Sequence, residues 1–197
     1  MKKQLAALAL FALTAVPMAA HAIVYQFTAS LSGDNEVPPR ATPASGLAVL
    51  SYDTADNTYD FAMSVANLTA PASAYHIHGA ATTAENAPVR VGLDAAPFFA
   101  SSSGGTLLVG GINVAAPAGI PATPASPTNA GHPAMSFLEM LQGGLAYVNV
   151  HTPTWPGGEV RGQLMQVAVV PEPGTYALML GGLAAVGFVA RRRRETA

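Results

Sequence analysis

The feature that most constrains the fold of this chain is a repeated alternation of apolar and polar residues over short segments. In IVYQFTASL (23–31), every second residue from Tyr25 to Leu31 is apolar, and the residues between them are polar. Side chains alternate between the two faces of a β-strand, so this period indicates a half-buried strand. Similar segments bounded by Gly, Pro, Asn and Asp lie at 47–53, 58–68, 72–79, 88–93, 105–114, 145–152 and 159–169. We therefore expect an all-β fold: an antiparallel, Greek-key-like β-sandwich or barrel of about eight strands.

One segment has helical spacing instead. In MSFLEMLQGG, Phe137, Leu138 and Leu141 recur at the spacing of one helix face, and two glycines follow. Glycine commonly ends a helix, so we expect one short helix at about 135–142. The preceding residues 116–133 are rich in Pro and Ala and show no period, which predicts a long loop.

The N-terminus carries a targeting pattern. Lys2 and Lys3 precede an apolar run, and Ala20-His21-Ala22 matches the small-x-small pattern that signal peptidases cleave. Residues 1–22 are therefore predicted to be a secretory signal peptide, with an uncleaved N-terminal anchor as the alternative. Residues 23–169 are long enough for one domain with a core of its own.

The C-terminal segment, 170–197, has three parts in a fixed order. Pro171, Glu172 and Pro173 come first, an apolar stretch follows, and the cluster Arg191, Arg192, Arg193 and Arg194 comes last. We expect a transmembrane helix at about 174–190, with the arginines on the cytoplasmic side and the domain outside. The apolar stretch is barely long enough to span a bilayer, which suits transient anchoring.

This order of Pro-Glu-Pro, apolar helix and arginines resembles a PEP-CTERM sorting signal. The resemblance implies an exosortase-type sorting enzyme as partner, transient anchoring in the inner membrane, and cleavage near the Pro-Glu-Pro motif. It also implies delivery to the cell surface or to an extracellular exopolysaccharide matrix. A C-terminal anchor that is never cleaved is the alternative.

Composition excludes several classes of function. Up to residue 170, the predicted mature domain has three arginines against nine acidic residues, a net charge of −6, so a nucleic-acid partner is not expected. The chain has no cysteine, which rules out disulfides and thiolate chemistry. No serine lies in a Gly-x-Ser-x-Gly elbow, and no carboxylate pair stands out, so we do not expect an enzyme.

The histidines could carry chemistry. His76 and His78 flank Ile77 and would project from the same strand face, about 6–7 Å apart. His151 ends a later predicted strand, whereas His132 lies in the proline-rich loop. Imidazoles are ligands for zinc or copper. Two interpretations remain open: His76, His78 and His151 hold copper or zinc, or no cofactor is bound and His76 and His78 brace the turn at Gly79.

Three longer blocks resemble the CHRD domain, a module first described in chordin. They are FTASLSGDNEVPPRATPASGLAVL, YHIHGAATTAENAPVRVGL and LQGGLAYVNVHTPTWPGGEVRGQL. The resemblance implies structural roles for Glu36, Pro38, Gly79, Asn149, Gly158, Glu159 and Arg161. Glu159 and Arg161 flank a PGGE turn and could pair with each other, or with Asp34 or Glu36. Ala80 and Ala81 replace a proline that is usual in the family.

We expect a non-enzymatic module at the cell surface or in a biofilm matrix, with a binding or structural role toward exopolysaccharide or surface proteins. The alternative is a secreted, histidine-based copper or zinc protein. In that alternative, a His-x-His strand and a lone later histidine resemble the copper site of copper-zinc superoxide dismutase and its sandwich. The chain lacks that enzyme's disulfide and its acidic metal-binding loop.

Overall fold

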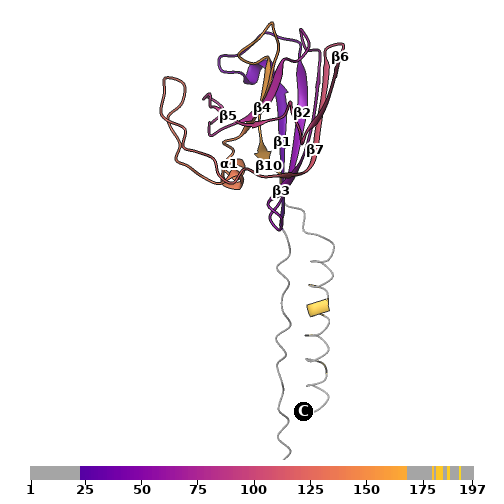
Figure 1. Ribbon diagram of the computed structural model, residues 1–197. Helices are drawn as coiled ribbons and strands as arrows, with labels where there is room; N and C mark the ends of the chain where they lie inside the picture. The colour runs from indigo at the N-terminus through magenta and orange to yellow at the C-terminus, as the bar shows by residue number, and fades with distance from the viewer. Residues whose placement is uncertain (1–22, 168–178, 180, 184–185, 187–190, 192–197) are drawn as a thin grey trace, which may run out of the picture.

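The computed structural model describes residues 23–167, 179, 181–183, 186 and 191 (Figure 1). The predicted signal peptide, the Pro171-Glu172-Pro173 motif, most of the predicted transmembrane helix and Arg192, Arg193 and Arg194 lie outside this part of the chain. Among the residues that are described, no helix combines the length and apolar character that crossing a membrane requires.

The described strands form one ten-stranded sheet in which all pairings are antiparallel. The strands are β1 (Val24–Ser32), β2 (Ser45–Asp53), β3 (Thr58–Ala66), β4 (Ala74–His78), β5 (Val89–Gly92), β6 (Phe99–Ser103), β7 (Thr106–Ala115), β8 (Tyr147–His151), β9 (Val160–Gln163) and β10 (Met165–Gln166). Their order is β5-β4-β8-β9-β1-β2-β3-β7-β6, with β10 beside β1. The prediction of a mainly antiparallel β fold is confirmed.

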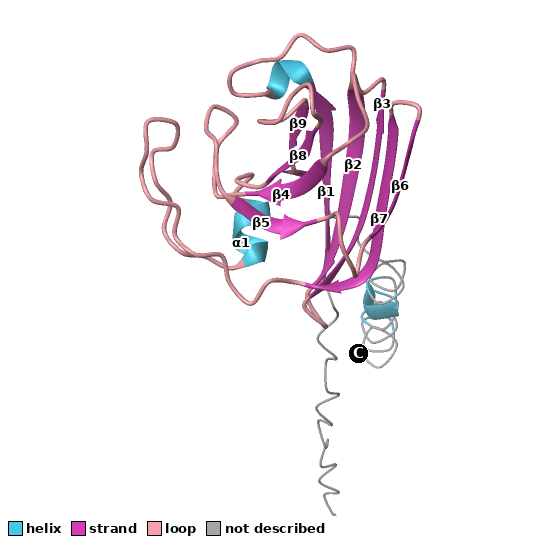
Figure 2. Cartoon of the chain, turned by 45° about the horizontal axis from the view of Figure 1, so that its top comes forward, coloured by secondary structure: helices cyan, strands magenta, loops and turns pink. Residues whose placement is uncertain are grey.

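The sheet curls into a half-barrel. One flank consists of β5, β4, β8 and β9, the other of β1, β2, β3, β7 and β6, and the two flanks join at a short pairing between β9 and β1. β9 pairs with β1 only at Ser32 and Arg161, whereas β1 and β2 pair along their whole length. Figure 2 shows β4 and β5 to the left of β1 and β2 and at a steep angle to them. The two flanks therefore enclose a common core.

The core takes one face of each alternating strand. Phe27, Ala29 and Leu31 of β1 are buried, as are the alternate residues of β3 from Tyr59 to Val65. The helix α1 (Phe137–Gln142) closes this core, with its Phe137 ring 5.3 Å from the ring of Tyr59. The apolar residues of the predicted alternating pattern are therefore the ones whose side chains are buried in the core.

The short helix lies where its spacing predicts. Ser136 accepts a hydrogen bond from the backbone of Glu139, and the Glu139 carboxylate accepts one from the backbone of Ser136, so a capping box begins the helix. The helix ends before Gly143, and Gly144 has a φ of +61°, which glycine adopts without strain.

The number of strands differs from the prediction of about eight. β6, with sequence FASSS, is exposed at every residue and pairs with β7 alone, so it lacks the alternation that burial imposes. The single strand predicted at 159–169 divides into β9 and β10 at Leu164, whose side chain is fully buried.

The proline-rich loop forms a narrow arm with three bridging pairs: Ile120 with Met135, Thr123 with His132, and Ser126 with Asn129. Near its tip, the buried Asn129 amide donates to the carbonyls of Ala80 and Asn86. The Arg90 guanidinium donates to Pro121 and Thr123 in the same arm. These contacts hold the arm (left in Figure 1) against the loop that follows β4.

Candidate metal centre

Strand register brings three of the five histidines together. β4 pairs with β8 so that Ala74 lies opposite His151, His76 opposite Asn149, and His78 opposite Tyr147. Directly paired residues share a face of the sheet. The three histidines therefore lie on one face of β4 and β8, while Ile77 and Val148 point into the core on the other face and are fully buried.

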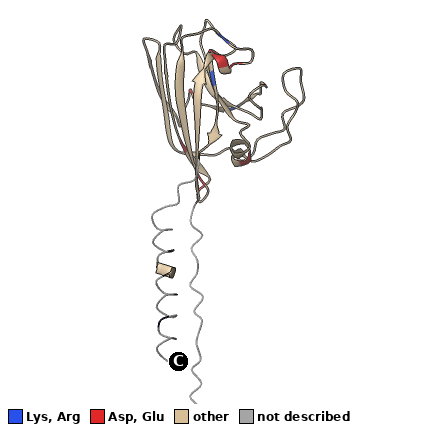
Figure 3. Ribbon diagram, turned by 180° about the vertical axis from the view of Figure 1, so that it is seen from behind, with Lys and Arg blue, Asp and Glu red and all other residues tan. Residues whose placement is uncertain are grey.

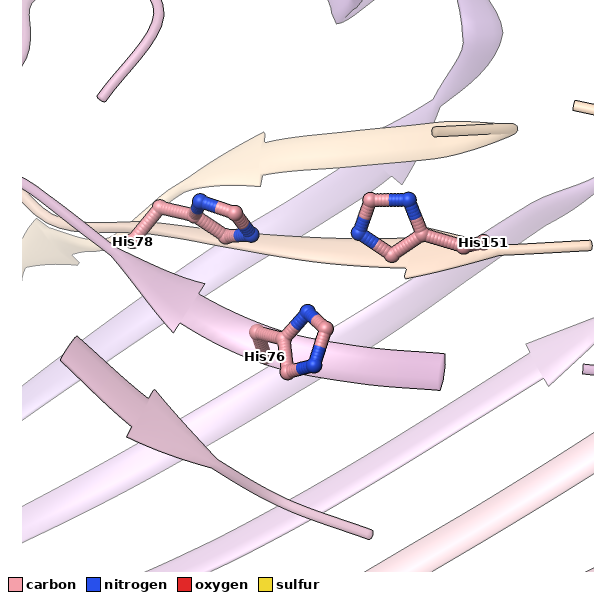
Figure 4. Close-up of side chains that lie close together, drawn as sticks. All are labelled: His76, His78 and His151. Atoms are coloured by element: carbon pink, nitrogen blue, oxygen red, sulfur yellow. The ribbon is translucent and has the colours of Figure 1, made fainter. Parts of the chain in front are cut away.

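The three rings are close neighbours. Ring centroids are 5.5 Å apart for His76 and His78, 5.2 Å for His76 and His151, and 6.0 Å for His78 and His151. One nitrogen of each ring lies within 4.8 Å of the other two. Figure 4 shows these nitrogens directed toward the space between the rings.

Backbone carbonyls orient two of the rings. The Nδ1 atom of His78 lies 2.9 Å from the carbonyl oxygen of Ala87, and Nδ1 of His151 lies 3.0 Å from that of Pro156. A carbonyl oxygen only accepts, so each Nδ1 carries the proton, and in a neutral ring Nε2 is then left with a lone pair.

The nitrogens that face the centre have no hydrogen-bond partner. Nδ1 of His76, Nε2 of His78 and Nε2 of His151 are all buried and unpartnered among the described residues. Buried polar atoms are rarely left unpaired, because each loses its hydration without compensation. A metal ion at the centre would satisfy all three nitrogens at once.

Burial keeps the imidazoles available as ligands. It lowers the pKa of His78 to about 4, with an opposing contribution from the Ala87 hydrogen bond and smaller lowering contributions from nearby cationic groups. Burial and then the neighbouring His151 lower the pKa of His76. His76 and His78 are therefore neutral near pH 7, and a neutral imidazole is the form that binds metal.

The distances between the ring nitrogens approach those of a zinc or copper site. Metal–nitrogen bonds of about 2.0–2.1 Å place the nitrogens of three ligands of one ion about 3.3–3.6 Å apart, so ring nitrogens that lie within 4.8 Å of one another would have to approach by up to about 1.5 Å to bind the same ion. The described residues offer three ligands here. His78 is buried, whereas His76 and His151 are half-exposed, so a fourth coordination position would face water.

Arg161 and Tyr147 form a layer behind His78. The guanidinium carbon of Arg161 lies 3.5 Å from the centroid of the Tyr147 ring. Arg161 is 1% exposed and donates to the carbonyls of Glu85 (2.7 Å) and Thr82 (2.9 Å). It thereby fixes the loop after β4 whose Ala87 carbonyl orients His78.

Glu159 has partners of its own and does not pair with Arg161. Its carboxylate accepts hydrogen bonds from the hydroxyls of Thr42 (2.7 Å), Thr69 (3.0 Å) and Thr152 (2.6 Å), and from the backbone of Thr69. His132 lies 3.1 Å from the Glu85 carboxylate and forms an ion pair with it when the imidazole is protonated. Burial lowers the pKa of Arg161, and the negative charge of the nearby Glu36 opposes this, but no ion pair joins these two described residues.

Glu36 meets Asn149 beneath the PGGE turn. The Asn149 amide donates to both carboxylate oxygens of Glu36, at 3.1 and 3.2 Å. Burial raises the pKa of Glu36 to about 7, although Asn149 and two arginines oppose this. Gly158 has a φ of +120°, and a Cβ there would lie 2.6 Å from both Asn149 Oδ1 and Glu36 Oε1. Only glycine fits this position.

The remaining motif residues are Gly79, at the end of β4, and Pro38. A Cβ on Gly79 would collide with Met140 Sδ, so glycine allows α1 to approach the end of β4. Pro38 is exposed in the loop after the short 3-10 turn η1 (Gly33–Asn35). The carbonyls of Ala87 and Pro156 were not identified from the sequence, because a backbone carbonyl carries no side-chain signal.

Models of two known protein families match this chain. A family model described as the CHRD domain matches residues 27–164, which include the three histidines, Glu36, Asn149, Gly158, Glu159 and Arg161. A model described as the PEP-CTERM protein-sorting motif matches residues 169–194. No curated protein and no solved structure matched the chain.

Proposed function

This chain belongs to the CHRD domain family, and we propose that it is an exported surface protein that holds a copper or zinc ion between His76, His78 and His151. The PEP-CTERM motif is a sorting signal recognised by exosortase, and together the two matched regions indicate a secreted, surface-targeted protein. Metal binding without catalysis is the activity we assign to the domain.

One observation carries this proposal. Three buried ring nitrogens without partners converge on one point, and two of the rings are turned toward it by hydrogen bonds from their other nitrogens to carbonyls. Metal-binding histidines characteristically make this second hydrogen bond, which fixes the tautomer and the ring orientation. Imidazole ligands without thiolates suit zinc and copper.

The test measures metal bound to the full-length protein. We expect about one equivalent of copper or zinc after exposure and desalting, and at least tenfold weaker binding by His76→Ala, His78→Ala and His151→Ala. His132→Ala is the matched control, because His132 pairs with Glu85 outside the cluster. Less than about a tenth of an equivalent on the parent protein, or equal loss in the control, would overturn the proposal.

A second candidate function is a binding module for exopolysaccharide or surface proteins. It is favoured by an apolar hollow of about 740 Å³ over β2, β3, β7 and β6, where Phe99 is 65% and Ile112 71% exposed. Figure 3 shows these strands mostly without charged residues. Exposed apolar surface of this kind commonly marks an interaction site.

This second candidate has its own test. Phe99→Ser and Ile112→Ser should reduce retention of the protein in the surface fraction of the producing cells, whereas His78→Ala should not. Unchanged retention of both serine variants would contradict it.

A further inference from the structure

A cleft of about 700 Å³ lies beside β1, β9 and β10, between η1 with the residues after it and the loop that follows β4. Its volume is in the range of small-molecule binding sites. None of its described lining residues belongs to the histidine cluster or to the apolar hollow over β2, β3, β6 and β7. The cleft is therefore separate from both sites considered above.

Two of the side chains that line the cleft carry ionisable groups and are buried. Arg161 is 1% exposed and Glu36 is 4% exposed. Arginine and glutamate are seldom buried this far unless partners hold them, so their positions are set by the fold. The cleft is thus lined in part by fixed polar groups, in contrast to the mobile charged side chains of an ordinary surface.

The contacts within the protein leave part of the hydrogen-bonding capacity of the cleft unused. Arg161 donates through Nη1 and Nη2, whereas its Nε forms no hydrogen bond with a described residue. Both carboxyl oxygens of Glu36 accept from the one amide group of Asn149, and each can accept a further bond. The Asn35 amide nitrogen donates to the carbonyls of Ser30 and Arg161, and its Oδ1 has no partner among the described residues.

The charges around the cleft nearly balance. Arg161 is positive, and Asp34 places an exposed carboxylate at the rim. Burial raises the pKa of Glu36 to about 7, so this carboxyl is partly protonated near neutral pH. A strongly charged ligand of either sign would meet a group of its own sign, whereas an uncharged ligand with many hydroxyl groups can use donors and acceptors alike.

Apolar side chains and hydroxyl groups complete the lining. Val37 and Pro39 line the cleft from the loop after η1, and Met165, which is 55% exposed, lines it from β10. The hydroxyls of Ser30 and Thr83 also line it, and a hydroxyl both donates and accepts. A sugar ring carries hydroxyl groups around its edge and C–H groups on its faces, so its surface matches this mixture of polar and apolar groups.

We propose that this cleft binds an uncharged saccharide. Nε of Arg161, Oδ1 of Asn35 and the carboxyl of Glu36 form hydrogen bonds with hydroxyl groups of the sugar. Val37 and Met165 pack against its C–H face. A few fixed polar groups beside apolar ones orient a ligand in this way in small-molecule sites. This inference goes beyond the proposed metal site and does not depend on a metal ion.

The first test measures binding of the full-length protein, in a detergent without sugar headgroups, to an array of neutral and uronic-acid-containing oligosaccharides. We expect binding to neutral members of the array and weaker binding to acidic ones. Ser30→Leu and Ala84→Trp fill the cleft from exposed positions, so each should weaken binding about tenfold or more. Ser102→Leu, in exposed β6, and His76→Ala, in the histidine cluster, should bind within about twofold of the parent.

The second test locates the bound sugar. When the neutral oligosaccharide that binds most tightly is added, the Nε–H signal of Arg161 in nitrogen-15 NMR should shift, and the backbone N–H signal of Ile112 in the apolar hollow should not. A shift at Ile112 instead, parent-like binding by both Ser30→Leu and Ala84→Trp, or no binding to any neutral oligosaccharide would each overturn this inference. Because His76→Ala tests the metal site and Ala84→Trp the cleft, failure of one proposal leaves the other standing.

Discussion

The ring of Tyr147 lies flat against the imidazole of His78, with ring centroids 4.9 Å apart and planes inclined by 9°. The Tyr147 hydroxyl donates to the Ala87 carbonyl, the same oxygen that accepts from His78 Nδ1. Arg161 covers the Tyr147 ring. Tyr147 therefore limits both the tilt of the His78 ring and the position of its hydrogen-bond acceptor.

Replacing Tyr147 should show which of these contacts matters more. Tyr147→Phe keeps the stack and loses the hydroxyl, so we expect the free energy of unfolding to fall by about 1 kcal/mol and metal binding to change little. Tyr147→Leu loses the stack as well and should cost about 2–4 kcal/mol and weaken metal binding. Denaturant unfolding and metal titration measure both effects; parent-like binding by Tyr147→Leu would refute the positioning role.

The two glycines of the PGGE turn should respond differently to alanine. Gly158→Ala places a Cβ against Asn149 and Glu36 at a positive φ, so we expect a loss of about 2 kcal/mol or more. At Gly157 the nearest atom to a new Cβ is Arg40 Nη2 at 3.9 Å, so Gly157→Ala should cost less than about 1 kcal/mol. Equal melting temperatures for the two variants would contradict this reading of the turn.

Glu159 and Arg161 should act independently, because they share no partner. Glu159→Gln disturbs the three threonines and should destabilise the domain by about 2–3 kcal/mol. Combined with Arg161→Lys, it should give additive losses, with a coupling free energy below about 0.5 kcal/mol. A double-mutant cycle measured by urea unfolding tests this, and a coupling above about 1 kcal/mol would mean that the two side chains do interact.

The raised pKa of Glu36 predicts how the free energy of unfolding depends on pH. Its pKa is raised from 4.5 to about 7, so between these values the folded protein keeps a proton that the unfolded chain releases. The stability contributed by Glu36 is therefore present below pH 4.5 and is lost as the pH rises through 7. Relative to Glu36→Gln, the parent should lose up to about 3 kcal/mol between pH 4.5 and 8.

The comparison with Glu36→Gln isolates this effect. Burial lowers the pKa of His78, which makes stability rise with pH below 6.5, but this contribution is common to both proteins and cancels in the difference. Unfolding curves over a pH series provide the measurement. A difference that stays constant with pH would show that Glu36 does not titrate as its burial implies.

The sorting motif predicts two distinct export defects. Glu172→Ala changes the Pro-Glu-Pro motif without altering the apolar stretch, so we expect full-length protein to remain in the membrane fraction. Replacing the arginines at 191–194 with serine removes the charge that holds the C-terminus inside, so that variant should be released or degraded. Immunoblots of cell fractions distinguish these results, and parent-like maturation of both variants would contradict a sorting role.

Much of the fold is predictable from local patterns. The alternation in β1 and β3, the spacing of Phe137 and Leu141, and the glycines after α1 each reflect a local preference of the backbone for one geometry. Both family matches likewise cover blocks that the sequence displays directly. β6 was not predicted, because an edge strand that is exposed on both faces shows no alternation of apolar and polar residues.

The sequence by itself determined that His76 and His78 share a strand face and that His151 ends another strand. Only the tertiary structure decided that these strands are neighbours, in a register that brings the three rings together. It also separated Glu159 from Arg161 and placed the Ala87 and Pro156 carbonyls behind the rings. The physical reason is that strand pairing depends on contacts between residues far apart in the chain, and on backbone groups that are chemically alike at every position.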